Sequence, residues 1–400
     1  MDNNRVNNQP KEGKMKSLVS LLLVAAMALV LPGSAAAADD AQTQWLKKAQ
    51  LGPYAPAAQD WKAIEAAARQ EGTVVLFSVS SRFNKIQKGF KDKYGVELVG
   101  HDITSDEQVE KFSREHKAGL FQTDVLFNNA TSELHGKMLP GKMIWNFVPD
   151  SIAPFLDESE KNPFLVQRWS SRVFVYNTAL NPAGPPLNNM WTVTRPEWKG
   201  KVLTPDPSGA AMANAFQTIL NRPKEMAAAY EKEFGKPIKL SSGMKNAAEE
   251  WLMQFIKNAV ISPSTDKIFE AVGAVKQKEA PVGITTFSKL RDVKKGVFEA
   301  SPIYEMEPVF GVGYATVLVV CDRAPHPNAA KLLIRYMMEA EGIAPWNVIG
   351  DYPSRADLEE AHVKEFKVPY YSKAKIWNSD PKHIFETSYD YLQFVMSIGK

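Results

Sequence analysis

The chain has 400 residues, of which 44% are hydrophobic and 23% charged, and its formal net charge is +3. This length predicts two domains, and the composition is that of an ordinary folded protein. Lys and Arg residues are spread along the sequence without a basic block, which excludes nucleic acid as an expected partner.

The first 38 residues have the three-part pattern of a secretory signal peptide. A basic region precedes the apolar run 18–31, and small residues follow this run up to Ala38, after which we expect cleavage. The run is short for a membrane span, and an N-terminal membrane anchor is the alternative interpretation. Met15 is an alternative start of translation to Met1.

Cys321 is the only cysteine, so the chain forms no intrachain disulfide and has no cysteine beside the expected cleavage site to carry a lipid. It lies in an apolar stretch that predicts a buried strand. An exported chain without disulfides is typical of a bacterial periplasm rather than of a eukaryotic extracellular space. We therefore expect a periplasmic protein that is not a lipoprotein.

A polar, Pro-containing lead-in at 39–59 precedes a regular alternation of helix and strand patterns. Asp60 is the expected cap of the first helix, and Ser105 with Gln108 forms the expected capping box of the third. The order strand, helix, strand, helix, strand predicts a parallel sheet with right-handed crossovers. Helices are predicted over 60–72, 83–95 and 105–119, and strands over 73–79, 96–102 and 123–130.

A second α/β unit follows a boundary rich in Pro and Gly at 181–189. An Ala-rich helix is predicted from residue 210, and Gly342 is the expected end of the last helix in the pattern. Strands are predicted over 172–178, 201–205, 281–287 and 310–320, and further helices over 246–259, from 264, and over 328–342.

In open parallel sheets, ligands bind beyond the carboxyl ends of the strands. Hydroxyl, amide and helix N-terminal groups dominate these ends here, so we expect hydrogen bonding to a ligand without a reactive nucleophile. Two such edges that face each other would form a cleft between domains. The polar residues at these ends are Ser80, Ser81, Arg82, Asn128, Asn129, Asp206, Ser208, Gly209, Thr285 and Thr286.

Ser208 stands directly before the Ala-rich helix pattern. Its hydroxyl is a suitable helix N-cap. The same helix end offers unpaired N–H groups and a partial positive charge, which bind anions. The residues alone leave both roles open.

No catalytic or nucleotide-binding motif is complete. Residues 136–143 nearly have P-loop spacing, but Met143 stands where a metal-binding Ser or Thr is needed, and Thr316 ends the dinucleotide-like stretch 311–316 inside a strand. The six histidines show no metal-ligand spacing, and nothing selects a pair of carboxylates for glycoside hydrolysis. We therefore expect no enzyme, no metal site and no cofactor.

The sequence resembles the periplasmic substrate-binding proteins of ABC importers, in the group that contains binders of ferric iron, phosphonates, sugar phosphates, thiamine and polyamines. The resemblance covers about 45–360 and is carried above all by "RPEWKGKVLTPDPSGA" at 195–210, with 311–338 and "DYPSR" at 351–355. It implies a type 2 periplasmic-binding-protein fold of the α/β class. Each of its two lobes would be a mainly parallel sheet flanked by helices, and two hinge strands would join them.

The implied lobe one extends over 39–174, with 307–400 returning to it, and lobe two over 178–306. The resemblance also implies a monomer that captures a small-molecule ligand between the lobes. A membrane permease and a cytoplasmic ATPase would be its partners.

Carried over residue by residue, the ligand loops of the group make Ser208 an expected ligand contact. Arg82 is expected either to pair with an anionic group of the ligand or to be a solvated residue at a helix start. The loops fall on Ser80, Ser81, Asn128, Ser208, Gly209, Ala210 and Thr285.

Ferric-binding members commonly have a Tyr-Tyr pair just after the strand that corresponds to 281–287, whereas this chain has "TTFSKL" there. The pair Tyr370–Tyr371 lies far downstream. Because ferric iron prefers anionic oxygen ligands, we expect an organic or phosphorylated anion instead. A ferric-ion-binding protein of the same class is the alternative, and an exported enzyme on this fold is less supported.

Overall fold

The computed structural model describes residues 34–398, so most of the expected signal peptide, at 1–33, lies outside the described residues. One unit of the chain ends at Trp45, and a compact unit extends from Leu46 to Lys400. Helix α1 (Ser34–Ala49) covers the first part of the polar lead-in at 39–59. No described helix has the length and apolar character that a membrane crossing needs.

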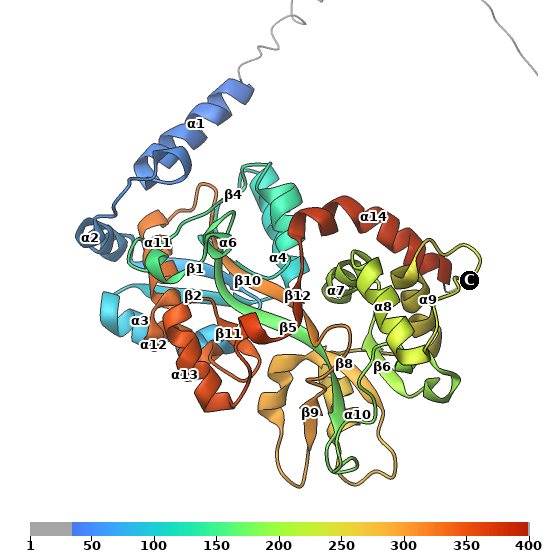
Figure 1. Cartoon of the computed structure of the whole chain (residues 1–400). Helices are drawn as coiled ribbons and strands as arrows, with labels where there is room; N and C mark the ends of the chain where they lie inside the picture. Colours follow the sequence, from blue (N-terminus) through green and yellow to red (C-terminus); the bar gives the residue numbers. More distant parts are fainter. Residues whose placement is uncertain (1–33, 399–400) are drawn as a thin grey trace, which may run out of the picture. The chain divides into compact units, whose positions relative to one another are not determined.

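The sheet of the compact unit is mixed, and its main path has the order β2-β1-β3-β10-β5-β8-β6-β7 (Figure 1). The described strands are β1 (Thr73–Ser78), β2 (Glu97–Asp102), β3 (Val125–Asn128), β4 (Ile144–Trp145), β5 (Leu165–Asn177), β6 (Val202–Pro205), β7 (Val260–Ser262), β8 (Val282–Thr286), β9 (Ala300–Pro302), β10 (Gly311–Cys321), β11 (Asp351–Pro353) and β12 (Ile376–Asn378).

Two groups of parallel strands are separated by two long antiparallel ones. β1, β2 and β3 are parallel, and so are β6, β7 and β8. Between them, β5 and β10 pair antiparallel with each other, and each joins one of the parallel groups. The first lobe contains β1–β3, and the second lobe contains β6–β8. The strands β5 and β10 between them are called the hinge strands. This arrangement confirms the expected two-lobed fold, while the residue bounds of the lobes stay a prediction.

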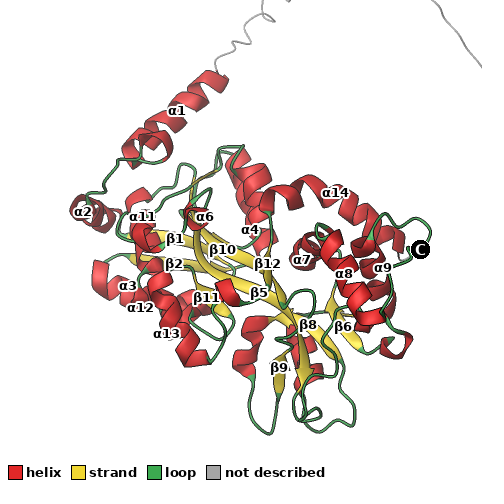
Figure 2. Ribbon diagram, in the orientation of Figure 1, coloured by secondary structure: helices red, strands yellow, loops and turns green. Residues whose placement is uncertain are grey.

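Helices flank both parts of the sheet (Figure 2). In the first lobe, α4 packs against β1 and β3, and α11 packs against β1 and α2; in the second, α10 packs against β6 and β8. The described helices of the compact unit are α2 (Trp61–Glu71), α3 (Gln87–Tyr94), α4 (Ser105–Lys117), α5 (Thr131–Glu133), α6 (Glu158–Lys161), α7 (Ala210–Leu220), α8 (Pro223–Phe234), α9 (Ala247–Asn258), α10 (Thr265–Gly273), α11 (Pro327–Met338), α12 (Ala340–Ile343), α13 (Ala356–Phe366) and α14 (Pro381–Ile398).

Local capping explains where several of these helices begin and end. Asp60 caps α2 as expected, because its carboxylate accepts from the backbone N–H of Ala63. The capping box of α4 lies one residue earlier than predicted and consists of Thr104 and Glu107. The predicted end of α11 at Gly342 is wrong, since the helix ends at Met338 and Gly342 belongs to α12.

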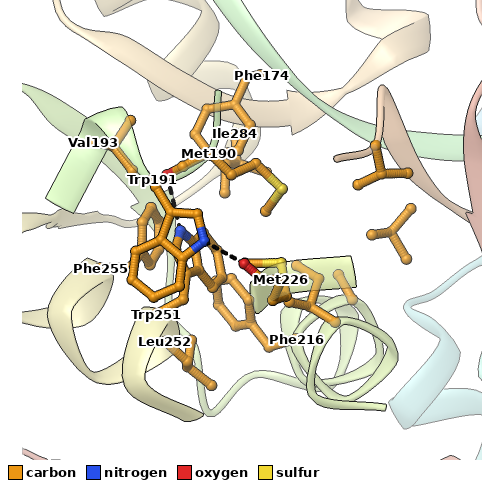
Figure 3. Packing of buried hydrophobic residues seen from close by; sticks show 14 of the residues in the cluster. Phe174, Met190, Trp191, Val193, Phe216, Met226, Trp251, Leu252, Phe255 and Ile284 are labelled. Atoms are coloured by element: carbon orange, nitrogen blue, oxygen red, sulfur yellow. Dashed lines mark hydrogen bonds between the residues drawn. The ribbon is translucent and has the colours of Figure 1, made fainter. Parts of the chain in front are cut away.

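The core of the second lobe is built around two fully buried tryptophans (Figure 3). The Trp191 indole N–H donates to the Met226 carbonyl at 2.8 Å, and that of Trp251 donates to the Met190 carbonyl at 2.9 Å. Each indole therefore buries its apolar rings without leaving its N–H unsatisfied. These contacts attach α8 and α9 to the segment that contains Met190 and Trp191.

Candidate functional site

A cleft of about 740 Å³ lies at the carboxyl ends of the parallel strands of both lobes. Residues after β1 and β3 line it from the first lobe, and residues after β6 and β7 line it from the second. Arg172 of β5 and Tyr314 of β10 come from the hinge strands, and Ser379 comes from the C-terminal segment. The remaining lining residues are Val79, Thr104, Ser105, Asp106, Asn129, Ala130, Pro205, Asp206, Gly209, Met212, Asn214, Ala215, Pro263, Thr265, Asp266 and Val312.

Three helices have their N-termini at this cleft. Thr104 and Ser105 stand at the start of α4, Gly209 is the N-cap of α7, and Thr265 is the first residue of α10. These helices have 13, 11 and 9 residues, so each contributes unpaired N–H groups and a partial positive charge at its start. The site therefore favours an acceptor-rich or anionic group.

Arg172 is the basic residue of the lining and lies on a hinge strand. Its Nη1 donates to the Thr286 hydroxyl at 2.6 Å, and its guanidinium carbon is 5.3 Å from the centroid of the Tyr314 ring. The buried Nε has no hydrogen-bond partner among the described residues. No carboxylate of residues 34–398 forms an ion pair with this guanidinium. The guanidinium is therefore a cation that is held in place and can still donate a hydrogen bond to a ligand.

Three carboxylates, Asp106, Asp206 and Asp266, also line the cleft. Asp206 accepts from the backbone N–H of Ser208 at 2.8 Å and from its hydroxyl at 2.7 Å. Asp266 pairs with Lys289. Burial, together with Glu133 and Glu107 nearby, raises the pKa of Asp106. Two of the three carboxylates are therefore engaged by groups of the protein itself.

The first-lobe wall is fixed by a hydrogen-bond network between α4 and the end of β3. The Asn128 side chain donates to the Ser105 carbonyl at 3.1 Å and to Gln108 Oε1 at 3.0 Å, and its oxygen accepts from the Ala130 N–H at 2.7 Å. The Ser105 hydroxyl donates to Asn129 Oδ1 at 2.5 Å. The Ser105 hydroxyl is thus bonded to the end of β3 and does not cap α4. The capping box therefore begins at Thr104.

Two of the predicted site residues lie directly behind the cleft wall. Asn128 is fully buried and holds the start of α4, while its neighbour Asn129 lines the cleft. Thr285 is also fully buried, and its hydroxyl donates to the Thr265 carbonyl at 3.3 Å at the start of α10. Both side chains position a helix N-terminus that lines the cleft.

The turn before α7 corrects the N-cap interpretation of Ser208. The N-cap is Gly209, which lines the cleft, and the Ser208 hydroxyl donates to Asp206 instead of accepting from the helix. Ser208 is exposed but does not line the cleft in this conformation. Ala210 is the first residue of α7. Contacts of Ser208 and Ala210 with a ligand stay a prediction.

The predicted residues after β1 do not line the cleft, although Val79 beside them does. Ser80 begins a short 3-10 helix and accepts from the Arg82 N–H at 3.3 Å, and Ser81 is exposed. Arg82 donates to Asp351 Oδ2 at 3.1 Å. This guanidinium is used within the fold, so Arg172 and not Arg82 is the arginine at the cleft.

The described part of the chain shows no preformed His, Cys, Asp and Glu cluster for a ferric ion, and the pair Tyr370–Tyr371 is not at the cleft. Residues 34–398 contain no cluster of three or more His, Cys, Asp and Glu side chains able to hold a metal ion. The Tyr371 ring stacks on Trp169 with centroids 5.7 Å apart, and neither Tyr370 nor Tyr371 lines the cleft. Tyr314 alone contributes a phenol to the cleft lining.

Sequence reasoning located the correct sheet edges but missed the hinge-strand residues. Arg172 and Tyr314 lie inside strands rather than after them, so a search of strand ends passes over them. Asp106 and Asp266 are in the first turns of α4 and α10, and Ser379 follows β12. A charged residue at the start of the predicted strand 172–178, as Arg172 is in "RVFVY", was the available signal.

Comparison with solved structures confirms the fold. Iron-bound HitA from Pseudomonas aeruginosa matches with a TM-score of 0.62 and 16% identity, over 82% of this chain and 99% of that one. Apo ferric ion-binding protein A from Pasteurella haemolytica matches with a TM-score of 0.61 and 16% identity, over 82% and 98%. The periplasmic binding protein P5PA matches with a TM-score of 0.57 and 15% identity, over 82% and 100%.

Comparison of the sequence gives a match to one family model but no curated relative. Residues 152–348, which contain both hinge strands and the second lobe, match the family of bacterial extracellular solute-binding proteins. A search of the curated proteins finds no match. The family match and the fold together confirm that the chain resembles the periplasmic solute-binding proteins, as its sequence predicted.

Proposed function

We propose that this protein is the extracytoplasmic substrate-binding component of an ABC importer. It captures a small solute in the cleft and delivers it to a membrane permease driven by a cytoplasmic ATPase. The family match, and a cleft lined from both lobes and both hinge strands, support this role. Export by a signal peptide to the periplasm, without a lipid anchor, is part of the proposal, as is action as a monomer without enzymatic turnover.

The solute is an organic anion that can carry a phosphate or phosphonate group. One observation carries this choice: Arg172 lines the cleft with no carboxylate partner in the described chain and with a buried Nε that bonds to nothing. A charged hydrogen-bond donor without a partner forms a strong, short hydrogen bond when a ligand brings an anionic oxygen. The starts of α4, α7 and α10 add partial positive charge at the same cleft.

A thermal-shift screen of residues 39–400 tests the proposal. The panel contains sugar phosphates, phosphonates, phosphate, sulfate, thiamine, polyamines and ferric citrate. We expect an organic anion to raise the melting temperature, because a ligand that binds only the folded state stabilises it. Arg172→Ala should weaken its binding about 10- to 100-fold, as expected for loss of a charge-assisted hydrogen bond.

The matched control is Arg114→Ala, which removes an exposed arginine whose partner is Glu110 on the same helix. This variant should bind as the wild type does. Equal affinity of the Arg172→Ala variant and the wild type for the best solute would refute the role of Arg172. Turnover of a panel compound would refute a pure binding role.

Ferric-ion binding is the second candidate function, and the named cargo of two structural neighbours favours it. Tyr314 would be the phenolate donor, and Asp106, Asp206 and Asp266 are the carboxylates in the lining. This candidate requires a visible absorption band after addition of ferric citrate and its loss in Tyr314→Phe. A colourless protein that ferric citrate does not stabilise would exclude it.

A further inference from the structure

The C-terminal helix α14 contacts both lobes. It packs against α5 and the π-helical turn Leu134–Met138, which follow β3 in the first lobe, and against α7 and α9 in the second. In Figure 1 the helix runs from beside α4 to α9. The sequence assigned all of 307–400 to lobe one, so this double contact was not expected. Helix α14 is therefore a third connection between the lobes, in addition to the two hinge strands.

The chain that leads into α14 passes along the cleft. β12 pairs in parallel with β10 at Gly311–Gly313, on a hinge strand. Ser379, the next residue after β12, lines the cleft and lies 3.1 Å from the Thr218 hydroxyl of α7. The strap, defined here as Ile376–Ile398, thus begins at the hinge and borders the ligand site.

The second-lobe attachment of the strap is deep. Tyr391 belongs to the hydrophobic core of that lobe and is 3% exposed, and Phe394 and Val395 pack beside it. Its hydroxyl donates to the Pro207 carbonyl at 2.6 Å, in the turn that leads to α7 and the cleft. The Thr387 hydroxyl also lies 2.8 Å from Gln217 Oε1. A buried aromatic with a satisfied hydroxyl is costly to extract, so this end stays attached.

The first-lobe attachment, on α5 and the turn Leu134–Met138, includes one very close contact. The Phe385 ring lies on Gly136 so closely that a Cβ at Gly136 would come within 2.1 Å of the Phe385 Cγ. Phe385 is only half-buried. Phe385 thus holds the first half of α14 on the first lobe, and its neighbour Ile384 is 3% exposed.

We infer that the strap is a tether that restrains opening of the cleft, and that the Phe385–Gly136 contact is part of its hold on the first lobe. Opening and closing by hinge motion is a common response of two-domain binding sites, and a contact present only in the closed state shifts the population toward it. In solute binding, which rests on the proposed function, the tether would slow both entry and release. Its effect on the lobes requires no solute.

Electron paramagnetic resonance of the mature chain tests the tether in the absence of solute. Spin labels are attached at Lys117→Cys, at the end of α4, and at Ser242→Cys, in the loop before α9; both positions are exposed. Cys321 is buried and stays in place. We expect Phe385→Ala to shift the distance distribution between the labels to longer values and to broaden it. Gly136→Ala, which disturbs the same contact from the other side, should give the same shift.

The matched control is Tyr389→Ala, which removes an aromatic ring of the same helix that is 71% exposed. Its distribution should coincide with that of the parent. Unchanged distributions in both Phe385→Ala and Gly136→Ala, with circular dichroism showing folded protein, would overturn the inference. Because the distance measurement needs no solute, a negative result for the tether is independent of a negative result in the solute screen.

Discussion

Arg172 and Tyr314 face each other across the two hinge strands, with the guanidinium carbon 5.3 Å from the centroid of the phenol ring. β5 and β10 are the strands that connect the two parallel parts of the sheet, so this pair lies where the lobes meet. A guanidinium over an aromatic face is held in place while its remaining donors stay available. The cleft therefore has an oriented cation that does not depend on either lobe alone.

The first prediction concerns the ring that holds this cation. Tyr314→Leu should weaken binding of the best organic anion of the panel about 2- to 30-fold, which corresponds to about 0.5–2 kcal/mol for the lost cation–π contact. Tyr314→Phe keeps the ring and should bind within about twofold of the wild type. Isothermal titration calorimetry measures both. Equal losses in the two variants would show that the hydroxyl, and not the ring, matters.

The second prediction separates a supporting asparagine from a lining one. Asn128→Ala removes three hydrogen bonds of a fully buried side chain and should lower the free energy of unfolding by about 2–3 kcal/mol, measured by urea denaturation. Asn129→Ala, at the adjacent position in the cleft lining, should cost about 1 kcal/mol or less and act mainly on solute binding. The reverse pattern would mean that Asn128 itself contacts the solute.

The sequence predicted the large elements of the fold because its helix and strand periods are strong. Asp60 and Gly72 bound α2 as expected, since a capping carboxylate and a left-handed glycine act locally. The capping box of α4 was misplaced by one residue because Ser105 bonds to Asn129, a partner 24 positions away. Contacts between residues so far apart in the sequence are set by tertiary structure, and the local sequence pattern does not predict them.

The sequence predicted the sheet edges of the candidate site and some of its lining residues, among them Asn129, Asp206 and Gly209. Asn128 and Thr285 are at the predicted edges, but strand pleating turns them inward and leaves Asn129 and Thr286 on the other side. Arg172 could not be assigned from the sequence, because its role depends on Thr286, Tyr314 and the unpaired state of its Nε. The double contact of α14 likewise depends on packing between distant segments.

The third prediction concerns Lys331, which is on the buried face of α11 and 2% exposed. Burial lowers the pKa of its ammonium from 10.5 to about 8. Because the unfolded chain keeps the higher pKa, the folded state is penalised in full below pH 8, and the penalty disappears as pH rises toward 10.5. Lys331→Met should therefore raise the free energy of unfolding at pH 7 by about 2 kcal/mol.

Urea denaturation at pH 7 and pH 10 measures the effect of Lys331→Met, and the gain should shrink at the higher pH. Lys62→Met, at an exposed position of α2, is the control and should change stability little at either pH. A loss of stability at pH 7 in Lys331→Met would show that the ammonium, 5.6 Å from the centroid of the Phe147 ring, stabilises the fold.

The fourth prediction concerns His362, which is completely buried on α13. Its Nδ1 lies 2.7 Å from Asn347 Oδ1, and its Nε2 has no hydrogen-bond partner among the described residues. Protonation would place an unpaired N–H and a charge in this apolar site, and burial accordingly lowers the pKa of the imidazole from 6.5 to about 4. The folded state thus excludes a proton that the unfolded chain binds.

The sign of the pH dependence follows from this difference in proton binding. Between pH 6.5 and pH 4 the unfolded chain gains a proton at His362 and the folded chain does not, so stability falls as the pH is lowered, by up to about 3 kcal/mol over this range. His362→Gln should make the slope of unfolding free energy against pH shallower in this range. His383→Gln, on the more exposed face of α14, should leave the slope as in the wild type. Equal slopes in the wild type and the His362→Gln variant would show that His362 does not titrate with a lowered pKa.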